Sequence, residues 1–169
     1  MPGRDKVTPQ GKQFFKQIKE LKKLHVRVGF QHGKESDSES GADLADIAMW
    51  NELGTEHAPP RPFLRQSVEN NAAHIKAMCA AQLKKIVKGQ ATARDALQAL
   101  GVMQKALVQN TIKTGDFEPN APITVHGGWM RRKGGKAFYI KGKKSNQPLI
   151  DTGRLRQSVQ YIIEAKRDD

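Results

Sequence analysis

The chain has few of the features that identify secreted, membrane-spanning or disulfide-bonded proteins. Its single cysteine, Cys79, cannot form an internal disulfide, so the cysteine content gives no indication of an oxidising compartment. No apolar run is long enough to cross a bilayer. The first twelve residues, MPGRDKVTPQGK, lack the apolar segment of a signal peptide. We therefore expect a protein made and used in the cytoplasm, or assembled there into something larger.

Recognisable catalytic and metal-binding motifs are also missing. The sequence has no glycine-rich phosphate loop after a strand, no H-E-x-x-H motif and no pair of cysteines. Its five histidines are scattered without the spacing of metal ligands. His32 lies among acidic residues, but that spacing matches no defined metal cage and favours a solvated loop. We predict no catalysis, no cofactor and no metal site.

Acidic residues are scarce relative to basic ones. The 169 residues include 17 Asp and Glu against 29 Lys and Arg, for a formal net charge of +12. Such a charge favours an acidic partner, either nucleic acid or the acidic surface of another protein. The length suits one domain with one buried core, so we expect a single domain over residues 1–169.

Three patterns occupy the first quarter of the chain. Residues 8–23 predict a basic amphipathic helix that starts at Thr8-Pro9 and either packs on a sheet or lies on a membrane surface. Residues 26–30 alternate apolar and other side chains and predict a half-buried strand. Residues 31–41, QHGKESDSESG, predict an exposed mobile loop.

The most informative segment is 43–65, DLADIAMWNELGTEHAPPRPFLR. It predicts a helix that ends at Gly54, a connector stiffened by prolines, and a second helix with Pro62 as its first residue. The spacing places Asn51 and Glu52 opposite the apolar face of the first helix. That face is expected to consist of Leu44, Ile47, Ala48, Trp50 and Leu53.

Arg61 is held between two prolines of this connector, which fixes its direction. Two interpretations are open. The guanidinium either caps carbonyl groups or pairs with Glu52 or Glu56 within the chain, or it belongs to a rigid arm that contacts a neighbouring subunit.

The second half begins with two long helices and continues with a basic segment. Residues 62–88 predict one helix with Cys79 on its buried stripe, and a second helix capped by Thr92 packs antiparallel to it. Residues 115–147 predict an extended basic loop with a short strand at 137–141. Three interpretations of that loop are open: an arm that becomes ordered on assembly, a surface that binds nucleic acid, or a plain mobile loop. Residues 159–163 predict a closing strand in the centre of a sheet, after a helical turn capped by Asp151 or Thr152.

Motifs that occur in a fixed order resemble a known family. N-E-L-G-T at 51–55 with P-P-R-P-F-L-R at 59–65 is similar to the NE(F/L)GT…PxRPFLR signature of phage tail-completion and neck proteins. These form the HK97 gp10-like minor tail component family, with the related Mu-like virion morphogenesis proteins. P-N-A-P-x-T at 119–124 and P-L-I-D-T-G-R-L-R-Q-S at 148–158 resemble the closing pattern of that family. The resemblance covers most of the chain from about Val26 onward.

The resemblance implies an α+β fold, with a small, mostly antiparallel sheet packed against several helices and with long extended loops. It implies a structural virion protein at the head–tail junction that joins tail to head after assembly in the host cytoplasm. The implied partners are copies of itself in a ring homo-oligomer and neighbouring neck, tail terminator or tail tube proteins. DNA in the channel would be contacted without sequence preference, and no membrane is involved. A basic nucleic-acid-binding protein is the alternative function.

The motifs and the basic loop together nominate two sets of residues. Those expected at subunit or partner contacts are Arg61, Pro62, Phe63, Arg65, Arg131, Arg132, Lys133 and Lys136. Those expected to support the motifs structurally are Asn51, Gly54, Thr55, Asp151, Thr152, Gly153, Leu155 and Arg156.

Overall fold

The computed structural model describes residues 7–37, 40–131, 134–143, 146–150 and 153–166. Within these residues it has seven helices and two antiparallel sheets of two strands each, so the predicted α+β class is confirmed. The contacts of the chain cluster in two compact units. The first unit takes residues 1–29, 67–107 and 160–169, and the second takes 30–66 and 108–159.

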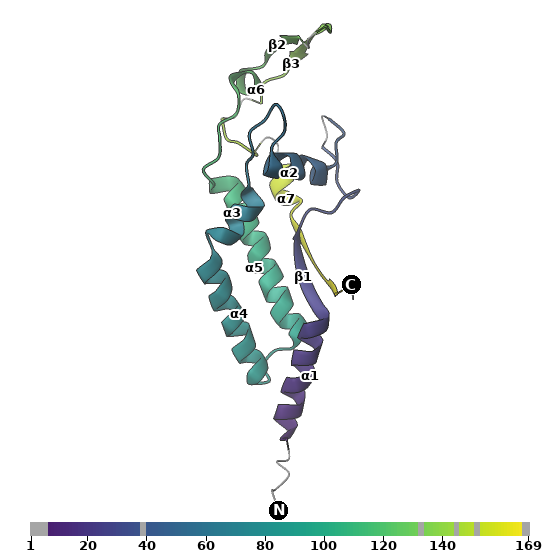
Figure 1. The fold of residues 1–169 in the computed structure, drawn as a ribbon, viewed down its shortest axis with the longest axis vertical. Helices are drawn as coiled ribbons and strands as arrows, with labels where there is room; N and C mark the ends of the chain where they lie inside the picture. The colour runs from purple at the N-terminus through teal and green to yellow at the C-terminus, as the bar shows by residue number, and fades with distance from the viewer. Residues whose placement is uncertain (1–6, 38–39, 132–133, 144–145, 151–152, 167–169) are drawn as a thin grey trace, which may run out of the picture. The chain divides into compact units, whose positions relative to one another are not determined.

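The first unit contains the sheet that joins the two ends of the chain. Helix α1 (Pro9–Lys23) begins where predicted, with the Thr8 side chain accepting from the Gly11 amide at 3.2 Å. It leads directly into β1 (Leu24–Gly29), which pairs antiparallel with β4 (Gln160–Ala165) (Figure 1). The predicted strands are confirmed. The central position expected for β4 is wrong, because in the described part of the chain this sheet has only two strands.

The long helix predicted over residues 62–88 is wrong, because the structure has two helices there. Helix α3 (Phe63–Glu69) and helix α4 (Ala72–Val87) are separated by a turn. The Asn71 side chain donates to the Ser67 carbonyl at 3.0 Å, which satisfies one of the carbonyl groups left over where α3 ends. Cys79 is exposed on α4, so its predicted burial is also wrong.

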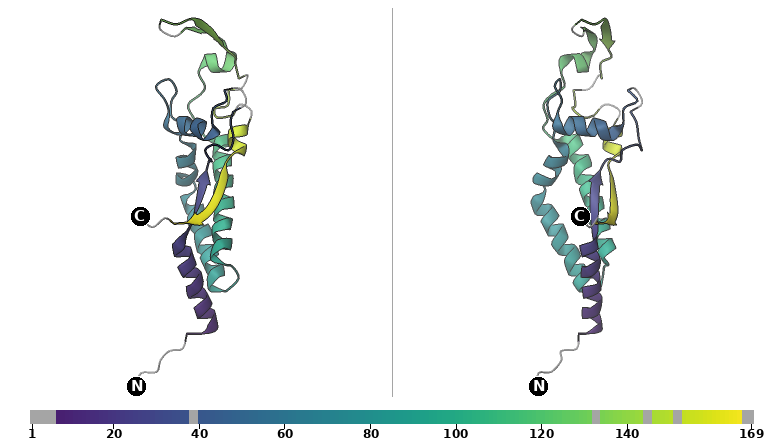
Figure 2. Two further views of the ribbon diagram at one scale, coloured as in Figure 1. Left: turned by 90° about the vertical axis from the view of Figure 1, so that its right-hand side faces the viewer. Right: turned by 45° about the vertical axis from the view of Figure 1, so that its right-hand side comes forward.

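Helix α5 (Ala93–Thr114) has the cap that the sequence predicts. The Thr92 amide donates to the Asp95 carboxylate at 2.9 Å, and the Asp95 amide donates to the Thr92 hydroxyl at 3.2 Å. The buried Gln17 of α1 accepts from the Ala93 amide at 2.6 Å and so caps the same helix end from a second element. Helices α4 and α5 run antiparallel, as predicted (Figures 1 and 2).

A glycine in α5 brings that helix against the sheet of the first unit. A Cβ atom added at Gly101 would lie 2.4 Å from Cδ2 of Tyr161 in β4. The tyrosine ring therefore lies directly on the helix backbone, in space that any side chain at this position would fill.

None of the helices in the described residues is both long enough and apolar enough to cross a membrane.

The second unit has its core at the start of α3. The Phe63 ring is fully buried and meets Phe30 edge to face, with ring centroids 5.9 Å apart. Helix α2 (Leu44–Leu53), the end of α5, the short helix α7 (Arg154–Gln157) and the residues on either side of α7 supply the remaining core side chains. These include Leu44, Ala48, Val108, Ile112, Leu149, Leu155 and Val159.

The extended loop predicted for residues 115–147 is wrong for much of that segment. It contains the short helix α6 (Pro122–His126) and an antiparallel hairpin of β2 (Gly128–Arg131) and β3 (Ala137–Ile140) (Figure 2). Only β3 was predicted. The hairpin pairs Trp129 with Tyr139 and Met130 with Phe138, and these cross-strand pairs stabilise a segment that is rich in glycine and lysine.

Candidate functional site

The motif-bearing corner of the second unit begins at the N-terminus of α2. The Asp43 carboxylate caps that helix by accepting from the Ala45 amide at 2.8 Å, and it also accepts from the Gly33 amide. These hydrogen bonds, with the one from Gly33 contributing most, lower the pKa of Asp43 below its ordinary value. The carboxylate therefore joins the loop that precedes α2 to the helix itself.

Gly54 ends α2 as predicted, and it also lets the backbone of Pro60 lie close to the end of that helix. Its φ angle is 78°, in the region that favours glycine. A Cβ atom there would lie 2.9 Å from the Pro60 nitrogen. Thr55 then pairs with Ala58 in an isolated bridge, with its amide 2.9 Å from the Ala58 carbonyl. The connector thus folds back tightly onto the end of α2.

The inward face of α2 contains Leu44 and Ala48, as predicted, but not Trp50 and Leu53. Trp50 and Leu53 are 46% and 64% exposed, whereas Asn51 and Glu52 lie on the partly buried side. The Glu52 carboxylate accepts from the amides of Leu64 and Arg65 at 2.8 and 3.1 Å. The first amides of α3 have no partner within the helix, and the positive end of the helix dipole favours a carboxylate there, so this position selects Glu52 over an apolar side chain.

Arg61 uses its side chain inside the second unit. It is only 8% exposed, and its Nε and Nη2 donate to the carbonyls of Glu118 and Pro119 at 2.9 and 3.2 Å. Its own amide donates to the Asn51 carbonyl at 2.6 Å. Burial lowers the pKa of the guanidinium, which nevertheless stays charged at neutral pH. Of the interpretations left open by the sequence, the structure supports the binding of carbonyl groups.

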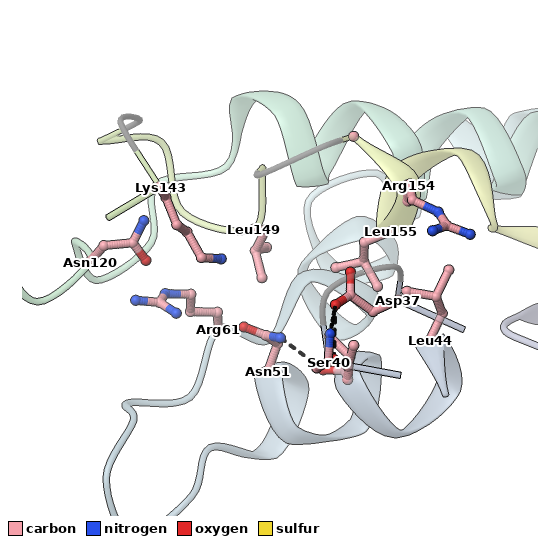
Figure 3. Close-up of a pocket in the computed structure, with 12 residues that line it drawn as sticks. Asp37, Ser40, Leu44, Asn51, Arg61, Asn120, Lys143, Leu149, Arg154 and Leu155 are labelled. Carbon is pink, nitrogen blue, oxygen red and sulfur yellow. Dashed lines mark hydrogen bonds between the residues drawn. The ribbon is translucent and has the colours of Figure 1, made fainter. Parts of the chain in front are cut away.

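The motif segments meet around one hollow of about 320 Å³ (Figure 3). Asn51 and Arg61 come from the first pair of motifs, Asn120 comes from the P-N-A-P motif, and Leu155 comes from the last motif. Segments that are up to about a hundred residues apart in sequence therefore form one local structure. The other lining residues are Asp37, Ser40, Leu44, Ile47, Lys143, Leu149, Gly153 and Arg154.

The final motif is held by backbone contacts. Gly153 precedes α7 with a φ angle of 77°, Leu155 is buried, and the Arg156 carbonyl accepts from the Gln109 side chain at 3.0 Å. Asp151 and Thr152, the predicted caps of this turn, lie outside the described residues. The structure therefore gives no outcome for those two predictions.

The residues predicted at subunit contacts fall into separate groups. Phe63 is a core residue, so its side chain is not available on the surface. Pro62 precedes α3, and its carbonyl accepts from the Gln66 amide at 2.9 Å, so the helix begins one residue later than predicted. Arg65, Arg131 and Lys136 are exposed. Arg132 and Lys133 lie outside the described residues.

The hairpin of β2 and β3 is a surface that the sequence did not reveal as folded. Trp129 and Tyr139 are 72% and 58% exposed although their rings meet at 5.7 Å between centroids. Arg131 lies on the same face of β2 as Trp129, because alternate residues of a strand share a face. The hairpin thus displays aromatic rings together with positive charge. Consecutive apolar residues among glycines and lysines at 129–130 and 138–139 were the signal for it.

No group of three or more His, Cys, Asp or Glu side chains in the described residues is arranged to hold a metal ion.

The comparisons with known proteins were made at three levels: family models, curated protein sequences and solved structures. None of them gives a match for this chain.

Proposed function

We propose that the chain is a structural virion protein of the head–tail junction, a tail-completion or neck subunit that joins the tail to the head without catalysis. The proposal starts from the resemblance of its ordered motifs to that family. The observation that carries it is the convergence of those motifs on one braced corner. Two polar side chains of these motifs, Glu52 and Arg61, bind backbone amides and carbonyls respectively.

Such engagement suits a subunit that must keep its shape under load. A side chain that binds carbonyls two at a time fixes the path of two segments relative to each other. The exposed aromatic hairpin supplies the complementary feature, because monomers seldom leave large aromatic side chains in water without a partner. In a closed ring, the same arm would meet the same neighbour all the way round.

Deletion of the gene in the producing phage or prophage tests this function. We expect electron micrographs of lysates to show filled heads and separate tails, or tails with defective ends. Complementation with the intact gene is the control and should restore joined particles. Infectious particles of normal yield and form from the deletion would refute the proposal.

A nucleic-acid-binding protein is the second candidate, and the hairpin is the observation that favours it. Exposed aromatic rings beside Arg131 and Lys136 form a surface on which unstacked bases and phosphates can bind. A gel-shift titration with single-stranded and duplex DNA at two salt concentrations distinguishes the candidates. Absence of binding at low salt eliminates this one, whereas tight binding with sequence preference would place it first.

A further inference from the structure

The outer face of α2 is an apolar stripe that the core of the second unit does not cover. Asp46, Met49, Trp50 and Leu53 stand at helical spacing of three and four residues and so share one face of the helix. Met49, Trp50 and Leu53 are all exposed. Amphipathic helices at a protein surface usually present polar residues to water, so this stripe calls for a covering surface.

Acidic groups border the α2 stripe. The Asp46 side chain is 38% exposed at one end, and Glu56 is exposed just beyond the other end. The surrounding segment, residues 30–66, has three Lys and Arg against seven Asp and Glu, a net charge of −4. It is an acidic segment in a basic chain. The surface that covers the stripe should therefore be apolar at its centre and basic at its rim.

The hairpin of the same unit has that character. Trp129 and Tyr139 form an exposed aromatic pair, with Arg131 on the same face and Lys136 exposed near the turn. Residues 119–150 contain seven Lys and Arg and no Asp or Glu, a net charge of +7. An aromatic centre with a positive rim on the hairpin matches an apolar stripe with a negative rim on α2.

We propose that the hairpin of one copy, centred on Trp129 and Tyr139, docks on the Met49–Trp50–Leu53 stripe of α2 in a second copy. Every copy carries both surfaces, so the contact is head to tail and propagates into a ring or an open chain. A nucleic acid is a poor occupant of the α2 stripe, because phosphates would face Asp46 and Glu56. The inference deepens the ring contact in the proposed function and identifies the partner as the chain itself.

Paired charge reversals test this contact in the full-length purified chain. One variant carries Arg131→Glu and Lys136→Glu on the hairpin, and the other carries Asp46→Lys and Glu56→Lys at the stripe. Sedimentation velocity over a range of concentrations should show the wild type associating. Each variant alone should associate about tenfold or more weakly, since like charges then face each other across the contact.

Mixing the two variants gives the decisive measurement. The hairpin of either variant then meets an oppositely charged stripe on the other, so an equimolar mixture should regain most of the wild-type association. Lys76→Glu with Lys84→Glu on α4 is the matched control for the hairpin variant, because it makes the same change in net charge at exposed sites outside both surfaces. We expect it to associate as the wild type does.

Apolar substitutions provide a second route if a reversed variant fails to fold by circular dichroism. Leu53→Gln and Trp129→Gln each remove an exposed anchor from one side of the contact. Each should weaken association about tenfold, because aromatic and large apolar anchors carry much of the energy of an interface. Both side chains are exposed, so the melting temperature of the monomer should change little.

Four results would overturn the inference. The first two are a wild type that stays monomeric at every concentration and association that the charge reversals do not change. The third is a mixture of the two variants that does not regain association. The fourth is a hairpin that binds DNA while self-association persists in variants whose hairpin is altered. Particle assembly is scored separately. Normal particles from the deletion would refute the proposed function but would not bear on the contact between copies. Defective particles from the deletion, together with a purified wild type that never self-associates, would support the proposed function and refute the contact.

Discussion

Replacement of Arg61 by alanine tests whether this side chain braces the second unit. The guanidinium is 8% exposed and donates to two carbonyls of the segment that follows α5. Removal deletes both hydrogen bonds and the packing of the aliphatic stem. It also frees the residues at 118–119 from the connector between α2 and α3.

The expected loss is about 2 kcal/mol of unfolding free energy. A hydrogen bond from a charged donor contributes roughly 1.5–3 kcal/mol to stability. Glu118 and Pro119 are exposed residues, so water can reach their carbonyls in the variant, and the total falls below the sum of two such bonds. For a chain of this length, each kcal/mol lowers the melting temperature by roughly 2–4 °C, so we expect a decrease of about 4–8 °C.

Thermal and urea denaturation followed by circular dichroism measure this loss. Arg65→Ala is the matched control in the same motif, because Arg65 is exposed, and its stability should stay within about 0.5 kcal/mol of the wild type. Arg61→Lys should fall between the two, since one ammonium group does not reproduce the planar fork of arginine. If Arg61→Ala is as stable as Arg65→Ala, the assignment of Arg61 as an internal brace is wrong.

Three shorter predictions address the same corner. Glu52→Gln should cost about 1 kcal/mol in urea denaturation by weakening the cap of α3, whereas Glu56→Gln, at an exposed position, should be neutral. Gly54→Ala should destabilise by at least about 1 kcal/mol more than Gly89→Ala, because both glycines have positive φ but only the first would meet backbone. Asp43 has a folded pKa below its ordinary 3.8, so its stabilisation is present above that pH and is lost as the pH falls through the folded value. Urea midpoints at pH 7 and pH 3 should therefore differ less for Asp43→Asn than for the wild type, and an equal difference would contradict this role.

Local signals in the sequence were sufficient for the starts of α1 and α5 and for the strands β1, β3 and β4. Thr8-Pro9 and the Thr92–Asp95 pair cap helices by contacts within a few residues of themselves, and such contacts can be predicted from spacing. The turn between α3 and α4 was missed because residues 62–88 keep a helical apolar pattern through it. The interruption depends on the Asn71 side chain reaching a carbonyl, which periodicity does not reveal.

The orientation of α2 and the role of Arg61 depended on residues far away in sequence. Apolar side chains occur on both sides of α2, so periodicity could not decide which side faces the core. The amides of α3 decided it, because they require the Glu52 carboxylate. The acceptors of Arg61 lie 57 and 58 residues further along the chain, and only the folded second unit brings them to it.

The closeness of Tyr161 to Gly101 has a practical consequence for anyone modifying this protein. Exchanging a mid-helix glycine for alanine is a common way to raise thermal tolerance, with a gain of up to about 1 kcal/mol from helix propensity. Here the added methyl group would collide with the aromatic ring at 2.4 Å and displace the C-terminal strand from the helix. A generally beneficial exchange would thus be harmful at this site, and any screen for hardier variants should leave the position untouched.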